Sequence, residues 1–599
     1  MKNDGSRVDT AARDEQALEI PVSRVRDRSP ALIGSQRSAD DTGQVGTARH
    51  PARMAVAELA TVPRPGQDGR HGEDDCHGED GRRGEDGRHG EAAVARGTRR
   101  RPGAPGRVTL ADRRWPLLAV LAAQAVLSLR LIWSNTAFQD EALYLRAGHL
   151  EWARLLHHAP IPDFPAYFSG APVIYPPLGA LADSMGGLTA ARILSLFFMF
   201  GVTSLLWATT GRLYGQRAAL LAAALFATLA GTQFLGAFAT FDAMALFLLS
   251  LAVWLGVRSA DCQFRARMTL LVASGLTLAG ADAVKYATTL FTPAVFIVVA
   301  LAVRQKRPGG AWLAAALAML GSWLALATAA LLAAGHQYWL GITTSTLGRA
   351  GSDAPVTTVL RQAYVWTSLI LVLAVIGAVL ASRGEARGKF LPAVLAAALL
   401  LAPAEQAKLH TTVSLQKHVV FGAWFAAIAA GYAMARFSRV DPGRGWAAVL
   451  ALPIAASTLF GSMGQAASLY RVWPDSASLI GTLRSAVHSH PGNYLAEDYD
   501  VEAYYLRGEV PWPRWSSTYY LSFPGALPGA ASYQAAISSH AFSLVILDFA
   551  DTAATDNQIT ADMRHAGGYY VLDRVGPYTV WAVRSPAPSQ PDGSDRARR

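Results

Sequence analysis

Eleven long apolar stretches are the feature that most limits how this chain of 599 residues can fold. Most of them approach the ~20 residues that an α-helix needs to cross the hydrocarbon core of a bilayer. They lie near 116–134, 188–210, 217–234, 239–257, 268–283, 287–303, 311–334, 362–381, 390–404, 419–436 and 444–463. Charged residues make up only 16% of the chain, against ~25% in soluble domains. The sequence therefore predicts an all-α polytopic membrane protein with about eleven transmembrane helices and excludes an ordinary soluble enzyme.

The short loops indicate the orientation. Basic loops alternate with longer loops that are more acidic or aromatic, and the basic ones lie near 211–217, 258–267, 304–307, 382–389 and 435–445. Because lysine and arginine in short loops stay on the cytoplasmic side, we expect a cytoplasmic N-terminus and a C-terminal region outside. Merging the fifth and sixth stretches into one broken span would invert every later loop, so we predict two spans there. High alanine, glycine and arginine content suggests a bacterial source and a plasma-membrane location.

The two ends of the chain are polar. Residues 1–110 contain a hexapeptide repeat rich in Gly, Asp, Arg and His from Gly66 to His89, and no apolar segment of a secretory signal. We expect a disordered cytoplasmic tail there, followed by a membrane domain at 111–464. Residues 465–585 combine one helical pattern, SASLIGTLRSAV, with strand-like runs FSLVILDF, YYVLDRV and TVWAV. This pattern predicts a small extracytoplasmic α/β domain, and 586–599 a second disordered tail.

Acidic residues stand at the outer ends of several spans. Asp140 and Glu141 follow the first span, at the start of a first outer loop (135–187) in which QDEALYLRAGHLEWARLLHH predicts a surface helix. Asp242 begins the fourth span. Acids in these positions can converge on one cavity.

Two further features lie near the second span. A Tyr-Pro-Pro-Leu element begins at Tyr175, and Arg192 lies a turn inside the span, where its charge needs a partner. Asp183 or Asp140 could supply that partner, and a purely structural pair is as compatible with the sequence as substrate contact.

These residues together resemble the GT-C superfamily of integral-membrane glycosyltransferases, particularly family 39 with its aminoarabinose transferases and protein mannosyltransferases. The resemblance covers about residues 116–305 well. It rests on Asp140-Glu141, Pro176-Pro177-Leu178, Ala190-Ala191-Arg192 and the basic turn at 211–223. The chain departs from the pattern near DAVKYATTLFTP, where Lys285 is present but a following Gly-Pro is not.

The resemblance implies catalysis on the outer face with a sugar donor linked to a polyprenyl phosphate. Asp140 is then the expected catalytic base, and Glu141 either orients the acceptor or caps the surface helix. The expected substrate-binding residues are Asp242, Arg192, Lys285, Lys417, His418 and Tyr175. Lys417 and His418, at the outer mouth of the tenth span, are the preferred site for the lipid phosphate, because a cation stabilises the leaving group. Interfacial snorkelling is the competing explanation for them.

The sequence commits to no cofactor. Some GT-C enzymes use a divalent cation with an acidic loop, but neither His157-His158 nor any other group here has a distinctive ligand spacing. The expected partners are a lipid-linked sugar donor, a glycan, lipid or protein acceptor, and membrane lipids, without nucleic acid. The aromatic segment 511–525 either contacts acceptor glycan or packs within its domain. A transporter or flippase of lipid-linked sugars, and a non-catalytic envelope scaffold, are the alternative functions.

Overall fold

The computed structural model describes residues 110–584, apart from 308, 350, 384–389, 438–444, 520, 522, 524–525, 527–528 and 551. The tails predicted at 1–110 and 586–599 lie outside the described residues, except for Leu110, where the first helix begins. The domain boundaries at 464 and 585 stay predictions.

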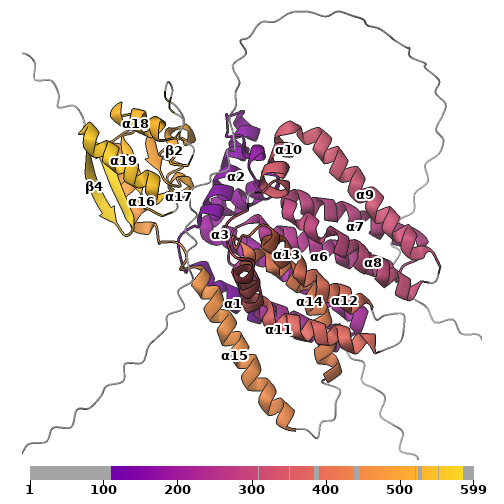
Figure 1. Ribbon diagram of the computed structural model, residues 1–599. Coiled ribbons are helices and arrows are strands. Elements are labelled where there is room, and N and C mark those ends of the chain that lie inside the picture. The colour runs from indigo at the N-terminus through magenta and orange to yellow at the C-terminus, as the bar shows by residue number, and fades with distance from the viewer. Residues whose placement is uncertain are drawn as a thin grey trace, which may run out of the picture. The chain divides into compact units, whose positions relative to one another are not determined.

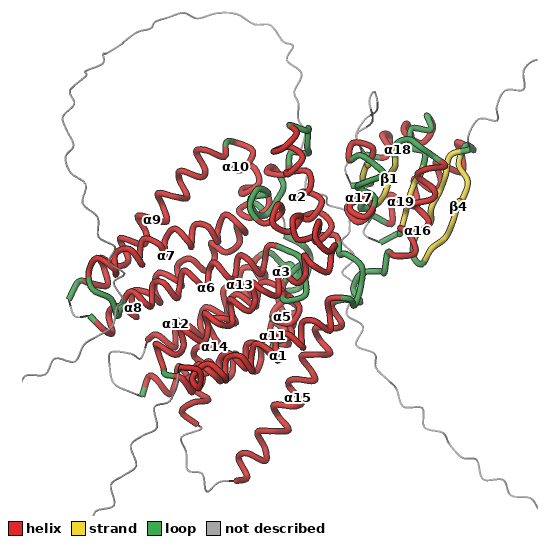
Figure 2. Tube along the Cα trace, turned by 180° about the vertical axis from the view of Figure 1, so that it is seen from behind, coloured by secondary structure: helices red, strands yellow, loops and turns green. Residues whose placement is uncertain are grey.

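The first part of the described chain is helical throughout (Figures 1 and 2). Its α-helices are α1 (Leu110–Ile132), α2 (Gln139–His157), α3 (Tyr175–Tyr214), α4 (Gln216–Thr228), α5 (Ala230–Leu235), α6 (Phe241–Ser259), α7 (Phe264–Val284), α8 (Thr292–Lys306), α9 (Ala311–Ala334), α10 (His336–Ile342), α11 (Val356–Ser382), α12 (Phe390–Ala397), α13 (Leu401–Lys408), α14 (Leu415–Phe437) and α15 (Gly445–Leu469).

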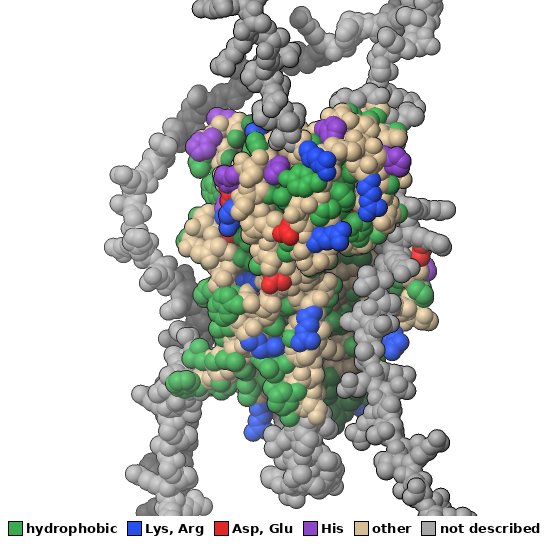
Figure 3. Space-filling model, turned by 90° about the vertical axis from the view of Figure 1, so that its left-hand side faces the viewer, with side chains coloured by type: hydrophobic (Ala, Val, Ile, Leu, Met, Phe, Trp, Pro, Cys, Tyr) green, Lys and Arg blue, Asp and Glu red, His purple; other side chains and the backbone are tan. Residues whose placement is uncertain are grey.

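Within the described residues, nine helical segments are long and apolar enough to cross a membrane. The prediction of two spans around residue 285 is confirmed, because one such segment ends at Val284 and the next begins at Tyr286. The predicted stretch at 217–234 is divided between α4 and α5, and the last predicted stretch lies on α15. On the face drawn in Figure 3, hydrophobic patches alternate with polar surface that carries scattered charged side chains. The chain is therefore a multi-span membrane protein.

Helix α14 lies in the middle of the helical packing. Of its most apolar window, 83% is buried, compared with 11% for α9. Small residues let neighbouring helices approach its backbone closely. A Cβ atom added at Gly431 would lie 2.5 Å from the Ala218 carbonyl oxygen, and one at Gly377 of α11 would lie 2.3 Å from that of Ala429. This close packing holds α14, whose first turn carries Lys417, against α4 and α11.

The predicted surface helix of the first outer loop forms as α2 and packs against α3. A Cβ atom at Gly148 would lie 1.9 Å from the Pro176 carbonyl oxygen, so only glycine allows this approach. The N-terminal end of α2 is fixed by Glu141, which accepts a hydrogen bond from the Phe138 backbone N–H at 3.1 Å. Helix α2 therefore packs directly against the backbone of the Pro-Pro-Leu element.

The last part of the described chain is a five-stranded sheet with helices on both faces, as the sequence predicts (Figure 1). The strands run in the order β2 (Trp515–Ser517), β1 (Tyr494–Ala496), β3 (Leu544–Leu547), β5 (Tyr578–Val583), β4 (Tyr569–Val575). The first three are parallel, and β5 runs antiparallel to β3 and β4. The helices are α16 (Ala477–Ser489), α17 (Asp500–Tyr505), α18 (Ala530–Ser538) and α19 (Ala553–Ala566).

The three predicted strands are confirmed, and the helical pattern at 476–487 forms as α16, whereas β1 and β2, of three residues each, were not expected. The aromatic segment 511–525 supplies β2, and its Trp515 is buried against Tyr494 and Tyr499. Packing within the domain therefore accounts for Trp515.

Candidate active site

Asp140 lies in the first turn of α2, where the helix N-terminus favours a carboxylate. Its Oδ2 accepts a hydrogen bond from Lys417 Nζ at 2.6 Å. The side chain of Asp140 remains 29% exposed, whereas that of Lys417 is only 7% exposed. Lys417 is thus held inside the protein by a carboxylate, and the snorkelling explanation for it is wrong.

A second ion pair joins Asp242, in the first turn of α6, to Lys285. Asp242 also accepts a hydrogen bond from the Thr240 hydroxyl at 2.9 Å. Lys285 follows the last residue of α7 and has an extended backbone, with φ −145° and ψ 111°. Both charged side chains of the pair are buried. The helical backbone is thus interrupted between two apolar spans, and this interruption places the Lys285 ammonium beside the buried Asp242 carboxylate.

The two ion pairs belong to one site. The Asp242 carboxylate interacts electrostatically with Lys417 as well as with Lys285. Aromatic rings frame both ammonium groups: Lys285 Nζ lies 5.2 Å from the ring centre of Phe241, and Lys417 Nζ lies 5.5 Å from that of Phe238. Rings at these distances stabilise a cation through their π faces. The site therefore holds two lysines and two aspartates from α2, α6, α14 and the α7–α8 break.

Arg349 adds a third cation to the site, and sequence reasoning missed it. It lies in the connection between α10 and α11, and its charge interacts with Asp140 and Tyr144. Burial lowers the pKa of the Arg349 guanidinium, an effect that the Asp140 carboxylate opposes. Burial and the negative charge of Asp140 raise the pKa of the Tyr144 phenol well above its usual range. The sequence assigns this loop to the outer side, where the charge rule for loops expects few basic residues. Arg349 is an exception to that rule, and this exception could have identified it as a candidate.

Glu141 and Arg192 form a separate, fully buried ion pair. Arg192 Nε and Nη2 donate to the two carboxylate oxygens at 2.8 and 2.7 Å, and the side chains are 0% and 1% exposed. Glu141 also accepts a hydrogen bond from the Ala239 backbone N–H at 2.8 Å. The partner expected for Arg192, Asp183 or Asp140, was therefore wrong, because Glu141 points into the core while Asp140 points into the site.

Asp183 has other partners. It accepts hydrogen bonds from the Tyr504 hydroxyl at 2.5 Å and from Arg507 at 3.0 Å, and lies 2.6 Å from His149 Nε2. Arg146, about one turn before His149 on α2, also forms a salt bridge with Asp500, about one turn before Tyr504 on α17. These contacts tie α2, and with it Asp140, to the C-terminal α/β part.

The other candidate residues lie as follows. Tyr175 is completely buried in the hydrophobic core, so we leave it out of the proposed site. His418 Nδ1 accepts a hydrogen bond from Gln406 at 2.6 Å, and the charges of Lys285 and Asp242 act on its ring, so it lies beside the site. His157 and His158 are exposed at the end of α2.

In this arrangement the Asp140 and Asp242 carboxylates each bind a lysine ammonium through one oxygen. A divalent cation at these carboxylates, which the sequence leaves open, stays a prediction.

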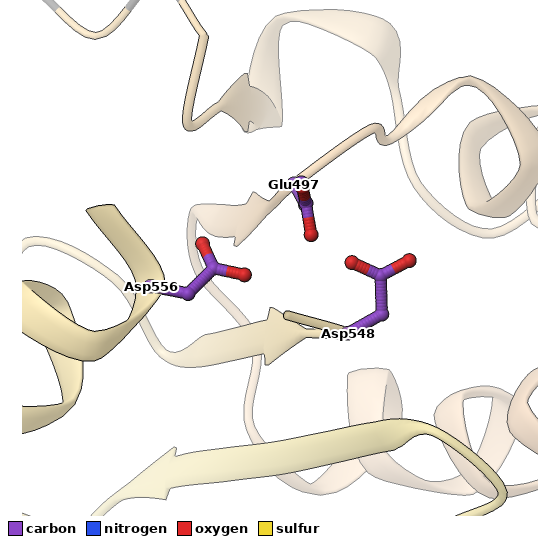
Figure 4. A group of neighbouring side chains, drawn as sticks. All are labelled: Glu497, Asp548 and Asp556. Atoms are coloured by element: carbon purple, nitrogen blue, oxygen red, sulfur yellow. The ribbon is translucent and has the colours of Figure 1, made fainter. Parts of the chain in front are cut away.

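Within the described residues, one group of three acids has carboxylate oxygens close enough together to hold a metal ion: Glu497, Asp548 and Asp556 (Figure 4). This group is far from Asp140 in the sequence. Glu497 and Asp556 there accept hydrogen bonds from the backbone N–H groups of Phe549, Ala550 and Thr552. Burial, with Glu497 beside it, raises the pKa of Asp556 to about 8. These acids therefore close a loop of the α/β part.

Comparisons with known proteins agree with the architecture. Residues 180–342 match the family model described as dolichyl-phosphate-mannose-protein mannosyltransferase. ArnT from Cupriavidus metallidurans, solved with bound undecaprenyl phosphate, superposes with a TM-score of 0.56 over 78% of this chain and 98% of its own, at 14% identity. The chain has the GT-C fold.

The Archaeoglobus fulgidus oligosaccharyltransferase shares this GT-C fold with the chain, at a TM-score of 0.51 and 12% identity, over 78% of this chain and 73% of its own. No curated protein matches the chain in sequence. At such identities the likeness concerns the GT-C fold, so the chemistry has to be argued from the residues of the site.

Proposed function

We propose that the chain is a membrane glycosyltransferase that moves a sugar from a polyprenyl-phosphate donor to an acceptor outside the cytoplasm. One observation carries this proposal: a partly exposed carboxylate, Asp140, stands in a site where three cations, Lys417, Lys285 and Arg349, interact with two carboxylates, Asp140 and Asp242. Three cations against two carboxylates leave one positive charge for an anionic substrate. The match to undecaprenyl-phosphate-bound ArnT supports a lipid phosphate as that anion.

The reaction follows from these groups. The acceptor oxygen or nitrogen attacks the anomeric carbon of the donor sugar while the bond from that carbon to the phosphate oxygen breaks. The acceptor proton passes to Asp140, and the electron pair of the broken bond stays on the polyprenyl phosphate. The leaving phosphate gains negative charge, which Lys417, Lys285 and Arg349 stabilise. When Lys417 turns toward the phosphate, it releases Asp140, which is then free to accept the proton.

Glu141 and Arg192 have a different part in this proposal. Because all their charged atoms are bonded inside the protein, they hold the N-terminal end of α2 and touch no substrate. Glu141 is thus a positioning residue for its neighbour Asp140. His418 supports the Lys417 end of the site through α14.

The transfer assay uses purified protein, radiolabelled sugars on undecaprenyl phosphate and envelope extracts as acceptors. We expect transfer that Asp140→Asn reduces by about 10²–10⁴ in rate, the usual effect of losing a general base. Lys417→Met should weaken donor use, whereas Lys306→Met, which breaks a lysine–aspartate pair with Asp261 instead, should not. Near-normal turnover in Asp140→Asn would remove Asp140 from the mechanism, and unlabelled acceptor with every donor tested would contradict the proposed activity.

The proposed location is the plasma membrane of a bacterium, with the N-terminus in the cytoplasm and the α/β part outside. The alternating basic loops support this orientation. In intact cells, a membrane-impermeant thiol reagent should label single cysteines placed near 150, 350 and 500. It should leave cysteines near 214, 306 and 386 unlabelled. Labelling at 306 without labelling at 350 would reverse the assignment.

A further inference from the structure

A carboxylate with neutral partners lies next to the break that carries Lys285. Asp282 is in the last turn of α7, and its hydrogen-bond partners within the described residues are two hydroxyls and an indole. The Thr288 hydroxyl lies 2.6 Å from Oδ1, the Thr292 hydroxyl 3.1 Å from Oδ2, and Trp323 Nε1 donates to Oδ2 at 2.9 Å. A carboxylate in an apolar membrane segment is costly, so its presence indicates a role beyond stability.

The three donors belong to three different segments. Thr288 lies in the short turn after the break, Thr292 begins α8, and Trp323 lies on α9. The Thr288 hydroxyl is also 2.8 Å from the Lys285 carbonyl oxygen. Asp282 thus connects the end of α7 to the backbone that follows the break, and both to α9. Three hydrogen bonds of 2.6–3.1 Å make this connection firm.

The first outer loop also forms backbone hydrogen bonds with the residues at this break. The Ala171 N–H donates to the Ala283 carbonyl at 2.8 Å, and the Tyr286 N–H donates to the Ser169 carbonyl at 2.9 Å. Between them, a Cβ atom at Gly170 would lie 2.0 Å from the Val284 carbonyl oxygen. The loop backbone therefore lies directly against the residues that flank Lys285.

We propose that Asp282 is a positioning residue that holds the α7–α8 break and thereby sets the place of the Lys285 ammonium against Asp242. An unbroken helix would satisfy its own backbone groups and carry residue 285 past the site. The break leaves those groups to be bonded by other residues, and the outer loop bonds the Ala283 carbonyl and the Tyr286 N–H. Asp282 holds the same break through side chains, by connecting Thr288 and Thr292 after it to Trp323 of α9. The role of Lys285 toward the donor phosphate rests on the proposed function. The role of Asp282 in holding the backbone of the α7–α8 break is independent of it.

The geometry is tested without any transfer assay. Ala171→Cys and Ala283→Cys, in a background with Cys76 and Cys262 replaced by serine, place two thiols on neighbouring backbones. We expect a short bifunctional thiol reagent to cross-link them rapidly, and Asp282→Asn to slow this reaction severalfold. Ser274→Ala is the matched control, because it removes a buried hydrogen bond of α7 to Ala252 about 12 Å along the helix from Asp282. An unchanged cross-linking rate in Asp282→Asn would overturn the proposal.

The link to Lys285 is tested by a double-mutant cycle on donor use. If Asp282 acts through Lys285, Asp282→Asn should lower kcat/KM for the donor by about 10–100-fold alone and have little further effect in a Lys285→Met background. If Asp282→Asn only destabilised the protein, its fold-decrease in kcat/KM would multiply with that of Lys285→Met. That result would contradict the proposed role. If Asp282→Asn does not accumulate in the membrane, Thr288→Val, which removes one donor only, replaces it in both experiments. Loss of the cross-linking effect refutes the positioning role; absence of transfer in the wild-type protein refutes only the proposed function.

Discussion

Asp140 and Glu141 are neighbours in the sequence, and their amide variants should fail in opposite ways. Glu141→Gln replaces one carboxylate oxygen by an NH2 group, which then faces donors: either Arg192 Nη2 and the Phe138 N–H, or Arg192 Nε and the Ala239 N–H. The Arg192 guanidinium, 1% exposed, loses its counter-charge. We therefore expect Glu141→Gln to reduce stability, with activity falling as folded protein is lost.

The magnitude follows from burial. Removing one partner of a buried ion pair costs about 3–5 kcal/mol, and each ~1.4 kcal/mol is a tenfold change in the folding equilibrium. The ratio of unfolded to folded Glu141→Gln protein should thus rise by about 10²–10⁴. Asp140→Asn should cost less than Glu141→Gln, because the Asp140 side chain is 29% exposed, the asparagine oxygen can still accept the Lys417 hydrogen bond, and the Asp242 carboxylate still interacts with Lys417.

The assay compares thermal denaturation in detergent, followed by gel filtration, with the transfer rate per folded molecule. Glu141→Gln should lose its monodisperse peak at a clearly lower temperature while its surviving molecules keep transferring. Asp140→Asn should denature close to wild type and be inactive. The double variant Glu141→Gln, Arg192→Met, which removes both charges, should regain part of the lost stability. A thermally normal, inactive Glu141→Gln protein would show that Glu141 takes part in the chemistry and refute this reasoning.

Three further outcomes are expected. Arg349→Gln should raise the KM for the lipid donor without lowering thermal stability, as measured by donor titration; an unchanged KM would remove Arg349 from the phosphate site. Gly148→Ala should reduce thermal stability by about 1–3 kcal/mol, because its Cβ would collide with the Pro176 carbonyl; wild-type stability would mean that α2 can shift freely. The pKa of Asp556 is raised to about 8 in the folded state, so folding takes up a proton, and the stability of the α/β part should be greatest at low pH and fall as pH rises toward 8. Denaturation across this pH range should show that slope in the wild type and a flatter one in Asp556→Asn.

The sequence alone determined the membrane architecture. Long apolar runs require helices because a bilayer offers no partner for free backbone groups, and the runs at 116–134 and 419–436 indeed lie on α1 and α14. Strand-like runs such as FSLVILDF predicted β3 for the same kind of local reason. Placing acids at span ends also brought Asp140 and Asp242 into consideration. Each of these inferences depends on residues close together in the chain.

Only the tertiary structure decided what each charged residue does. Neighbouring helix positions point about 100° apart, so Asp140 faces the site while Glu141 faces Arg192, and the sequence could not distinguish the two. Lys417 meets Asp140 across 277 positions of the chain, so what looked like a snorkelling cation is a buried one. The pairing partner of a charge is set by which helices pack together, and no local pattern in the sequence records that packing.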